Sequence, residues 1–569
     1  MRSRQPEAAV DAIVARTGAA PVLIILALLL LLPGFFTLPP MDRDEPRFAQ
    51  ASKQMLETSD FVAMRFGAEA RNKKPVGIHW LQASAVSIGE ALGVPDARHQ
   101  IWLYRLPSLL GALLAVLLTY WAALPMVTRS FAMLAALFVA ATPLLGVEAR
   151  LATTDAVLLA TVVAAMGALG RVYLARDAES RSRIGTPVLF WGAIGVGLLI
   201  KGPITPLVVA LTALVLSVRE RSGRWLGALR PLPGVILCLL FVLPWFVLIL
   251  IQTKGAFLTD AVGHDLLGKV AGDQESHGAP PGFYLLTVWL TGWPLAPFVL
   301  LVAPTIWRQR RAPAVAFLLA WVVPTWLVFE IFHTKLVHYA LPIFPGLAIL
   351  AAYGLEAMAK SSDAIKAPGR VSLWLLFGLL SLVPVVILVL VVGGQGRLWE
   401  LPVAGTVLAV AAVFVAIALA WHSRATLIDG DVRQAGLVAV LAAVPLYLLV
   451  YAYVLTPEIG PALAVSPRLA EAARLGFDGT CVDPLYATVG DREPSLMFAT
   501  NGRLLMTDPG GAARFIAEGG CRAVFVAQQD VAAFNAALDH TLPVREVSRV
   551  AGIGVNGGAK LDIGVYVRQ

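Results

Sequence analysis

Residues 41–81 read MDRDEPRFAQASKQMLETSDFVAMRFGAEARNKKPVGIHWL, and they lie between two long apolar stretches of the chain. This segment carries two acidic clusters, several arginines and a Lys-Lys-Pro turn. Charged side chains are costly inside hydrocarbon, so a charge-rich segment beside apolar runs indicates a polar loop at a membrane surface. We expect this loop to form part of a functional site.

The composition of the chain defines its class. Of 569 residues, 58% are hydrophobic and 14% are charged, and the mean hydropathy is +0.75. Lipid offers no hydrogen-bond partner for free backbone groups, so apolar runs of about 20 residues must be helices. The composition therefore predicts a polytopic α-helical membrane protein. The formal charge of +8 comes from basic residues dispersed among loops, which argues against nucleic acid as a partner.

The apolar runs predict about 13 transmembrane helices. Lysine and arginine are concentrated on one side, with about 20 in one set of short loops and about six in the other. Because cytoplasmic loops carry the excess of positive charge, this asymmetry predicts a cytoplasmic N-terminus and an outer C-terminal tail. The spans are expected near residues 20–38, 105–127, 131–147, 155–174, 187–200, 203–218, 233–251, 283–303, 313–331, 338–357, 371–393, 402–421 and 435–456.

Three segments are expected to leave the membrane on the outer side. Residues 39–104 form the first loop, and residues 252–282 form a shorter one. Residues 457–569 alternate short apolar runs with helix-like runs, which predicts a soluble α/β domain with a small, partly parallel sheet. The chain thus divides into a transmembrane domain, residues 1–456, and this outer domain.

The three cysteines differ in their surroundings. Cys238 falls within a span, as a small buried hydrophobic residue. Cys481 and Cys521 each open a predicted strand of the outer domain. An oxidising compartment would permit a disulfide between them, and two separate buried thiols are the alternative.

The first loop contains a helical pattern. Phe48, Ala51, Ser52, Met55 and Leu56 follow i, i+3, i+4, i+7, i+8 spacing. This spacing predicts an amphipathic helix that lies in the membrane interface with its apolar face toward lipid.

Two carboxylates stand at the start of that helix. Asp44 and Glu45 precede Pro46, at a helix N-terminus that favours negative charge. They could simply cap the helix, or they could act on a substrate, and the pattern leaves both interpretations open.

Basic residues are sparse on the outer side, yet several fall there. A lysine near the end of a span often extends to the lipid headgroups, which would explain any one of them. Five or six together fit an anionic phosphate better. They are Arg47, Lys73, Lys74, Lys201, Lys269 and Lys335. Lys335 belongs to FHTKLVHYALPIFP, which adds His338 and Tyr339.

Two patterns raise the question of a metal. Asp42-Arg43-Asp44 fits the Asp-x-Asp motif of nucleotide-sugar enzymes, but soluble nucleotide sugars are cytoplasmic and this loop is expected outside. His264, Asp265 and His277 in the second outer loop could bind a divalent ion, although their spacing matches no closed site. A divalent metal ion therefore stays open as a cofactor.

An ordered set of sequence pieces resembles a known superfamily. DEPRFAQASKQMLETSDFV, NKKPVGIHWLQA, ARLATTDAVLL, LLIKGPI, LPWFVLI and TKLVHYALPIFPGLAIL occur in this order within residues 40–355. They resemble the polyprenyl-phosphate-sugar-dependent glycosyltransferases of bacterial inner membranes, the GT-C superfamily. The strongest likeness is to the lipid A aminoarabinose transferases, and protein O-mannosyltransferases belong to the same group.

The resemblance implies a GT-C fold, a periplasmic site and inverting transfer of a sugar from a polyprenyl phosphate to a lipid or glycan acceptor such as lipid A. It implies that Asp44 is the principal catalytic carboxylate and Asp155 a second acidic position. Lys74 matches the lysine that holds the donor phosphate, Tyr339 a tyrosine near it, and Lys269 a phosphate-binding arginine.

One position departs from the family pattern. Relatives carry an acidic residue where this chain has Lys73, so the resemblance does not identify the sugar as aminoarabinose. A protein O-mannosyltransferase and a transporter of lipid-linked sugars stay open as alternatives. The candidate catalytic residues are Asp44 and Asp155. The candidate substrate-binding residues are Glu45, Arg47, Lys73, Lys74, Lys201, His264, Lys269, Lys335, His338 and Tyr339.

Overall fold

A computed structural model of the chain describes most of its residues. The described residues are 18–40, 44–176, 184–261, 263, 278–360, 403–451, 464–477 and 481–568, apart from gaps at 482, 492, 540 and 555–558 and with isolated positions between 378 and 389.

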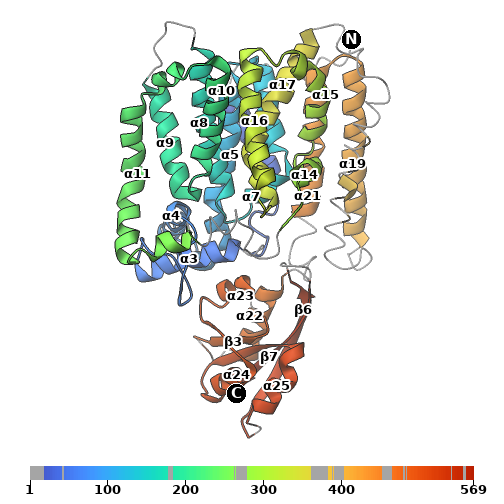
Figure 1. Ribbon diagram of the computed structural model, residues 1–569. Coiled ribbons are helices and arrows are strands. Elements are labelled where there is room, and N and C mark those ends of the chain that lie inside the picture. Colours follow the sequence, from blue (N-terminus) through green and yellow to red (C-terminus); the bar gives the residue numbers. More distant parts are fainter. Residues whose placement is uncertain are drawn as a thin grey trace.

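Most of the chain forms one bundle of apolar helices (Figure 1). Seven of the described helices are long and apolar enough to cross a membrane, and α2, α6 and α9 are shorter apolar helices. The helices and helical turns of the bundle are α2 (Ala19–Leu31), α5 (Ile101–Ala123), α6 (Arg129–Ala140), α7 (Pro143–Glu148), α8 (Asp155–Leu174), α9 (Gly185–Lys201), α10 (Ile204–Glu220), η2 (Arg224–Leu229), α11 (Pro231–Gln252), α12 (Ala256–Leu258), α14 (Phe283–Thr291), α15 (Leu295–Arg308), α16 (Pro313–Ile331), η4 (Val337–Ile343), α17 (Phe344–Lys360), α19 (Val403–Ile428), α20 (Val432–Leu441) and α21 (Ala443–Leu449).

Most of the predicted spans fall on helices of this bundle, but the predicted count of 13 is not confirmed, since the spans expected at 131–147 and 435–456 are each divided between two helices. The span expected at 283–303 consists of α14 and α15, which bend by 117° at the break between them. Pro294 lies at this break and has no backbone N–H to continue the helix. The span expected at 371–393 lies largely outside the described residues.

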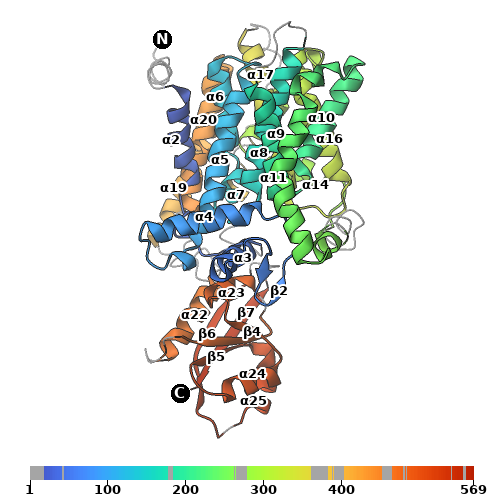
Figure 2. The ribbon, with the colours of Figure 1, turned by 90° about the vertical axis from the view of Figure 1, so that its left-hand side faces the viewer.

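A layer of shorter elements crosses one end of the bundle (Figure 2). This layer contains α3 (Glu45–Thr58), the two-stranded hairpin β1 (Arg65–Phe66) and β2 (Glu69–Ala70), α4 (Gly77–Ala91) and η1 (Ala97–His99).

The sequence predicted that α3 turns its apolar face toward lipid, and this prediction is wrong. Phe48 belongs to the main core of the bundle, and Met55 packs with Trp245 and Ile249 of α11. α3 is amphipathic, but its apolar face is buried against protein. The spacing predicts that one face is buried and cannot say which surface buries it.

The C-terminal region forms a small mixed sheet with helices. Its elements are α22 (Val465–Gly476), β3 (Leu485–Val489), α23 (Pro494–Ala499), β4 (Leu504–Met506), α24 (Pro509–Ala517), β5 (Arg522–Ala527), η9 (Gln528–Asp530), α25 (Val531–Ala537), β6 (Val544–Ile553) and β7 (Lys560–Arg568). The strand order is β4-β3-β5-β7-β6. β4, β3 and β5 are parallel, and β7 pairs antiparallel with β5 and β6, so the predicted partly parallel sheet is confirmed.

The two cysteines of this region are joined. Cys481 and Cys521 form a disulfide, with their Cα atoms 5.7 Å apart. Cys238 is a free, buried cysteine in α11, as predicted. In Figures 1 and 2 the sheet region lies beyond α3, so that α3 is enclosed between the bundle on one side and α23 on the other.

Candidate active site

Several elements bring polar side chains to the end of the bundle that α3 and α4 cover. α8 begins at Asp155 and α9 ends at Lys201. Because α8 and α9 pack side by side in opposite directions, the start of one lies beside the end of the other. The Lys201 ammonium donates to an Asp155 oxygen at 2.6 Å, and both side chains are less than one-tenth exposed. The two residues form a buried ion pair at the start of α8.

A cavity of about 280 Å³ opens beside this ion pair. Lys74 and His338 interact electrostatically with Asp155, and the Lys201 ammonium lies 5.6 Å from the ring centre of Tyr339. The polar lining residues are Lys73, Lys74, Asp155, Lys201, Thr334, His338 and Tyr339. The remaining lining residues are Pro75, Leu158, Leu198, Leu199, Gly202, Pro203, Ile204, Val242, Trp245, Phe246, Phe257, Ala261, Phe329, Phe332 and Pro342. The cavity therefore combines a long apolar wall with a cluster of positive charge.

Asp44 lies close to this cluster, although it does not line the cavity. Its carboxylate is half exposed and lies 3.9 Å from both Arg47 and Arg71. It occupies the N-cap position of α3 but accepts no capping hydrogen bond from the helix. Burial alone would raise the pKa of Asp44, but the positive charges of Arg71 and Lys74 outweigh that effect and hold the pKa below its usual value.

Glu45 has a different environment from its neighbour. Its side chain is fully buried, and its oxygens accept from Arg105 Nε at 2.6 Å, Arg105 Nη2 at 3.0 Å and the Ala152 N–H at 3.0 Å. Glu45, which was expected to bind substrate, therefore does not line the cavity. The carboxylate is engaged by Arg105, and it anchors the first turn of α3 to α5.

Two of the predicted basic residues also lie outside the cavity lining. Lys335 is 5% exposed and donates to the Ala279 and Phe332 carbonyls, at 2.8 Å each. Its ammonium therefore holds a turn, and Lys335 does not line the cavity where it was expected to bind substrate. Arg47 lies beside Asp44 rather than in the cavity lining. His264, Lys269 and His277 lie outside the described residues.

Three charged residues at this end of the bundle escaped the sequence interpretation. Arg71 lies over the Phe48 ring at 4.8 Å and beside Asp44. Glu148 lies 3.7 Å from His338 and accepts from the Thr153 hydroxyl at 2.9 Å. Arg105 and Glu148 interrupt apolar stretches of the sequence. An ionisable residue in such a stretch needs a partner, and this pattern could have identified both residues.

The part of the chain that the structure describes contains no group of three or more His, Cys, Asp or Glu side chains placed to hold a metal ion. The histidines proposed as metal ligands, His264 and His277, belong to the segment that is not described.

Comparisons with known proteins agree with this architecture. Residues 22–258 match the family model of dolichyl-phosphate-mannose-protein mannosyltransferase. The chain is 29% identical, over 367 residues, to an undecaprenyl phosphate-alpha-4-amino-4-deoxy-L-arabinose arabinosyl transferase of Pseudomonas paraeruginosa, and this match covers 63% of this chain and 64% of the relative. The corresponding enzyme of Aeromonas hydrophila is 28% identical, over 62% of this chain and 64% of the relative. The chain thus matches slightly less than two thirds of the length of these relatives.

Solved structures show the same fold. The crystal structure of ArnT from Cupriavidus metallidurans bound to undecaprenyl phosphate superposes with a TM-score of 0.73, at 20% identity, over 96% of this chain and 98% of that one. The archaeal oligosaccharyltransferase AglB from Archaeoglobus fulgidus superposes with a TM-score of 0.51, at 14% identity, over 90% of this chain and 69% of that one. These matches agree with the resemblance drawn from the sequence: the chain is similar in sequence to undecaprenyl phosphate-aminoarabinose arabinosyl transferases and has the fold of ArnT.

Proposed function

We propose that the protein is a glycosyltransferase that takes a sugar from a polyprenyl phosphate and transfers it, with inversion, to an envelope acceptor such as lipid A or the core of lipopolysaccharide. The observation that carries this proposal is the cavity, whose lining combines many apolar side chains with Lys74 and Lys201. An isoprenoid chain needs an apolar wall, and a phosphate needs fixed positive charge. The relatives are named for a donor of this kind, undecaprenyl phosphate carrying an arabinose derivative.

The proposed reaction is a displacement at the anomeric carbon of the sugar. An acceptor oxygen forms the new glycosidic bond while the bond to the phosphate oxygen breaks, and the phosphate leaves with the electron pair. Negative charge on that oxygen grows in the transition state, so the Lys74 ammonium stabilises the transition state more than the ground state. Lys201, fixed by Asp155 at 2.6 Å, adds a second positive charge in a set position.

Asp44 is the proposed general base. Burial raises the pKa of Asp44, but the positive charges of Arg71 and Lys74 lower it by more, so the pKa lies below its usual value. The carboxylate is therefore ionised at neutral pH and can accept the proton of a sugar hydroxyl. With a phosphate acceptor the nucleophilic oxygen already carries negative charge, and Asp44 would then orient groups instead.

We infer that the site lies on the periplasmic side of the bacterial inner membrane. The arginines of three predicted inner loops gather at the opposite end of the bundle from Asp155. Arg219 donates to the carbonyls of Arg310 and Arg311, and Arg176 pairs with Glu220 at 3.7 Å. Positive charge of this density favours the cytoplasmic side.

A protein acceptor is the second candidate, because the matching family model is named for transfer of mannose to protein. A transporter of lipid-linked sugars is less consistent with the charges, which gather at one end of the bundle rather than at its middle.

The decisive experiment uses purified protein and a radiolabelled polyprenyl-phosphate sugar. Acceptor-dependent release of free polyprenyl phosphate, lost in Asp44→Asn, supports the transferase. Movement of the intact donor across vesicles without release would refute it. Parallel assays with lipid A and with a peptide pool separate the two acceptor classes.

A further inference from the structure

The C-terminal sheet region contacts the helix that carries the proposed base, and this contact has no part in the mechanism above. α3 begins at Glu45, directly after Asp44. Toward the bundle, the Ser52 hydroxyl donates to Gln82 Oε1 at 2.6 Å and lies 2.8 Å from His79 Nδ1. The opposite side of α3 meets α23 and the turn that follows it.

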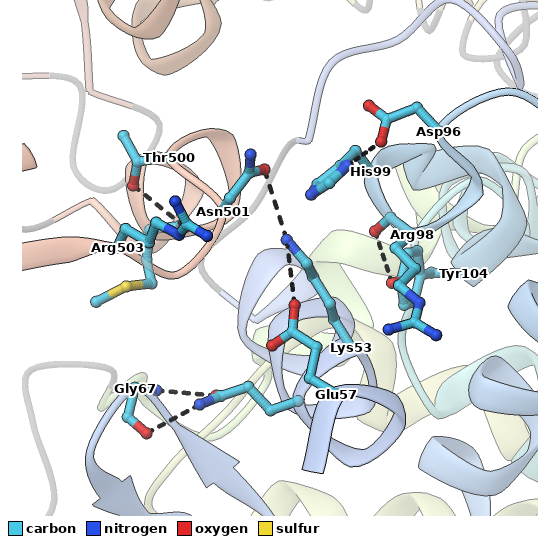
Figure 3. Close-up of polar contacts among 12 residues, drawn as sticks. Lys53, Glu57, Gly67, Asp96, Arg98, His99, Tyr104, Thr500, Asn501 and Arg503 are labelled. Atoms are coloured by element: carbon cyan, nitrogen blue, oxygen red, sulfur yellow. Dashed lines mark hydrogen bonds and ion pairs between the residues drawn. The ribbon is translucent and has the colours of Figure 1, made fainter. Parts of the chain in front are cut away.

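Lys53 is the polar centre of this contact (Figure 3). Its side chain is 1% exposed, and its ammonium lies 3.5 Å from Asn501 Oδ1 and 3.7 Å from Glu57. Burial lowers the pKa of Lys53 to about 8, although Glu57 opposes that shift. A lysine buried this deeply needs every available acceptor, and one of them belongs to the sheet region.

Gln50 of α3 and Gly502 of the sheet region lie against each other. Gln50 is fully buried, and neither atom of its amide has a hydrogen-bond partner within the described structure. Gly502 has a φ of +75°, and a Cβ there would lie 2.6 Å from Gln50 Nε2. A Cβ at 502 would therefore displace the buried amide of Gln50, and a larger side chain would press on α3 itself.

Apolar contacts also join α3 to the sheet region. Phe498 of α23 packs with Ala49 of α3 in one cluster, and its ring meets that of Tyr104 edge-on at 5.8 Å. Gln54 of α3 bonds both the N–H and the carbonyl of Gly67 in the hairpin, while Phe66 of the same hairpin packs on the core of the sheet region. The sheet region thus packs against one side of α3.

We propose that the C-terminal sheet region is a positioning element of the active site, holding α3 so that Asp44 keeps its place beside Arg71 and Lys74. This inference rests on the proposed function. A helix of 14 residues behaves as a rigid rod of roughly 21 Å, pinned near its start by Glu45. A shift at Gln50 or Lys53 therefore tilts the helix about this anchor and changes the direction in which its first turn presents Asp44 to Arg71 and Lys74. Gln50, Lys53 and Gly502 are positioning residues, since none of them lines the cavity.

The chain offers a matched pair of variants for the test. Gly502 and Gly520 share a φ of +75°, but a Cβ at Gly520 meets nothing within 4 Å. Gly502→Ala and Gly520→Ala therefore both place a side chain at the same unfavourable positive φ, and only the first collides with the Gln50 amide. We expect Gly502→Ala to lower kcat by about 10–100-fold, the usual effect of misplacing a reacting group by about 1 Å. Affinity for labelled polyprenyl phosphate should stay unchanged, and Gly520→Ala should match the parent in both. Gly502→Leu should enlarge the loss.

A second variant distinguishes positioning from general damage. Gln50→Ala in the Gly502→Ala background removes the colliding amide and should restore most of the lost kcat. Contact between α3 and the sheet region is measured separately, in a protein that carries Lys53→Cys and Asn501→Cys. The measurement is the yield of the disulfide between these two cysteines, and Gly502→Leu should reduce it. Reduced cross-linking with normal kcat would overturn the proposal, as would unreduced cross-linking in Gly502→Leu or equal losses in Gly502→Ala and Gly520→Ala. If the parent itself released no polyprenyl phosphate, the proposed function would fail while the cross-linking still reported the contact.

Discussion

Glu45→Gln should destabilise the protein, whereas the same loss of charge at the adjacent residue should not. Glu45 and Arg105 are both fully buried, and the carboxylate accepts two hydrogen bonds from the guanidinium and one from the Ala152 N–H. Without that charge, Arg105 keeps only uncharged acceptors, namely the carbonyls of Phe35, Leu38 and Pro39 and the amide oxygen of the new side chain. Breaking one partner of a buried pair costs about 3–5 kcal/mol.

The assay is thermal unfolding in detergent at one fixed scan rate, because unfolding of a large membrane protein is commonly irreversible. A cost of this size corresponds to a melting temperature lower by roughly 5–10 °C. The double variant Glu45→Met/Arg105→Met should recover much of the loss, since an apolar pair removes both buried charges together.

Asp44→Asn is the matched control. Asp44 is half exposed and makes no capping bond, so its melting temperature should stay close to that of the parent. Its turnover should fall about 10²–10⁴-fold if it acts as a general base. A parent-like melting temperature for Glu45→Gln would refute the anchoring role. Turnover of Asp44→Asn within a few-fold of the parent would exclude the base and favour a phosphate acceptor.

Three further predictions concern other parts of the molecule. Lys74→Ala should weaken binding of labelled polyprenyl phosphate by about 1.5–3 kcal/mol, the value of a charge-assisted contact. Lys360 is an exposed lysine of α17, so Lys360→Ala should bind normally. Equal affinity of both variants would mean that Lys74 contacts lipid headgroups rather than the donor phosphate. Burial raises the pKa of Asp491 to about 6 from 3.8, so the folded state binds this proton more tightly than the unfolded state, and stability falls as pH rises from 3.8 through about 6. Asp491→Asn should therefore raise the melting temperature at pH 8 and leave it nearly unchanged at pH 4, and an unchanged value at pH 8 would contradict the shift. Cysteines at the exposed positions Lys560 and Ser222 should be labelled by a membrane-impermeant reagent from the periplasm and from the cytoplasm, respectively, and the reverse pattern would overturn the proposed orientation.

Hydropathy was sufficient to predict most of the helices. The predicted spans 155–174 and 313–331 coincide with α8 and α16. An apolar run in lipid has to satisfy its own backbone hydrogen bonds, so its length and composition already imply a helix. Hydropathy did not predict the 117° bend between α14 and α15, because an apolar run reads the same whether it is one helix or two.

The ordered motifs in the sequence were also sufficient to predict the likeness to the aminoarabinose transferases and most of the polar residues of the cavity. Lys73, Lys74, Asp155, Lys201, His338 and Tyr339 all line it. Residue type and membrane side together indicated that these groups belong to one charged site. Their pairing was not predictable, since Asp155 and Lys201 are 46 positions apart and meet only because α8 and α9 are antiparallel.

The sequence by itself determined that Asp44 and Glu45 stand at the start of an amphipathic helix in a charged loop beside the membrane. Only the tertiary structure decided that one of them stays half exposed beside Arg71 and Lys74 while the other is buried against Arg105, 60 positions away. The physical reason is that consecutive residues at a helix start point in different directions, so each side chain takes its electrostatic environment from whichever distant element packs against it.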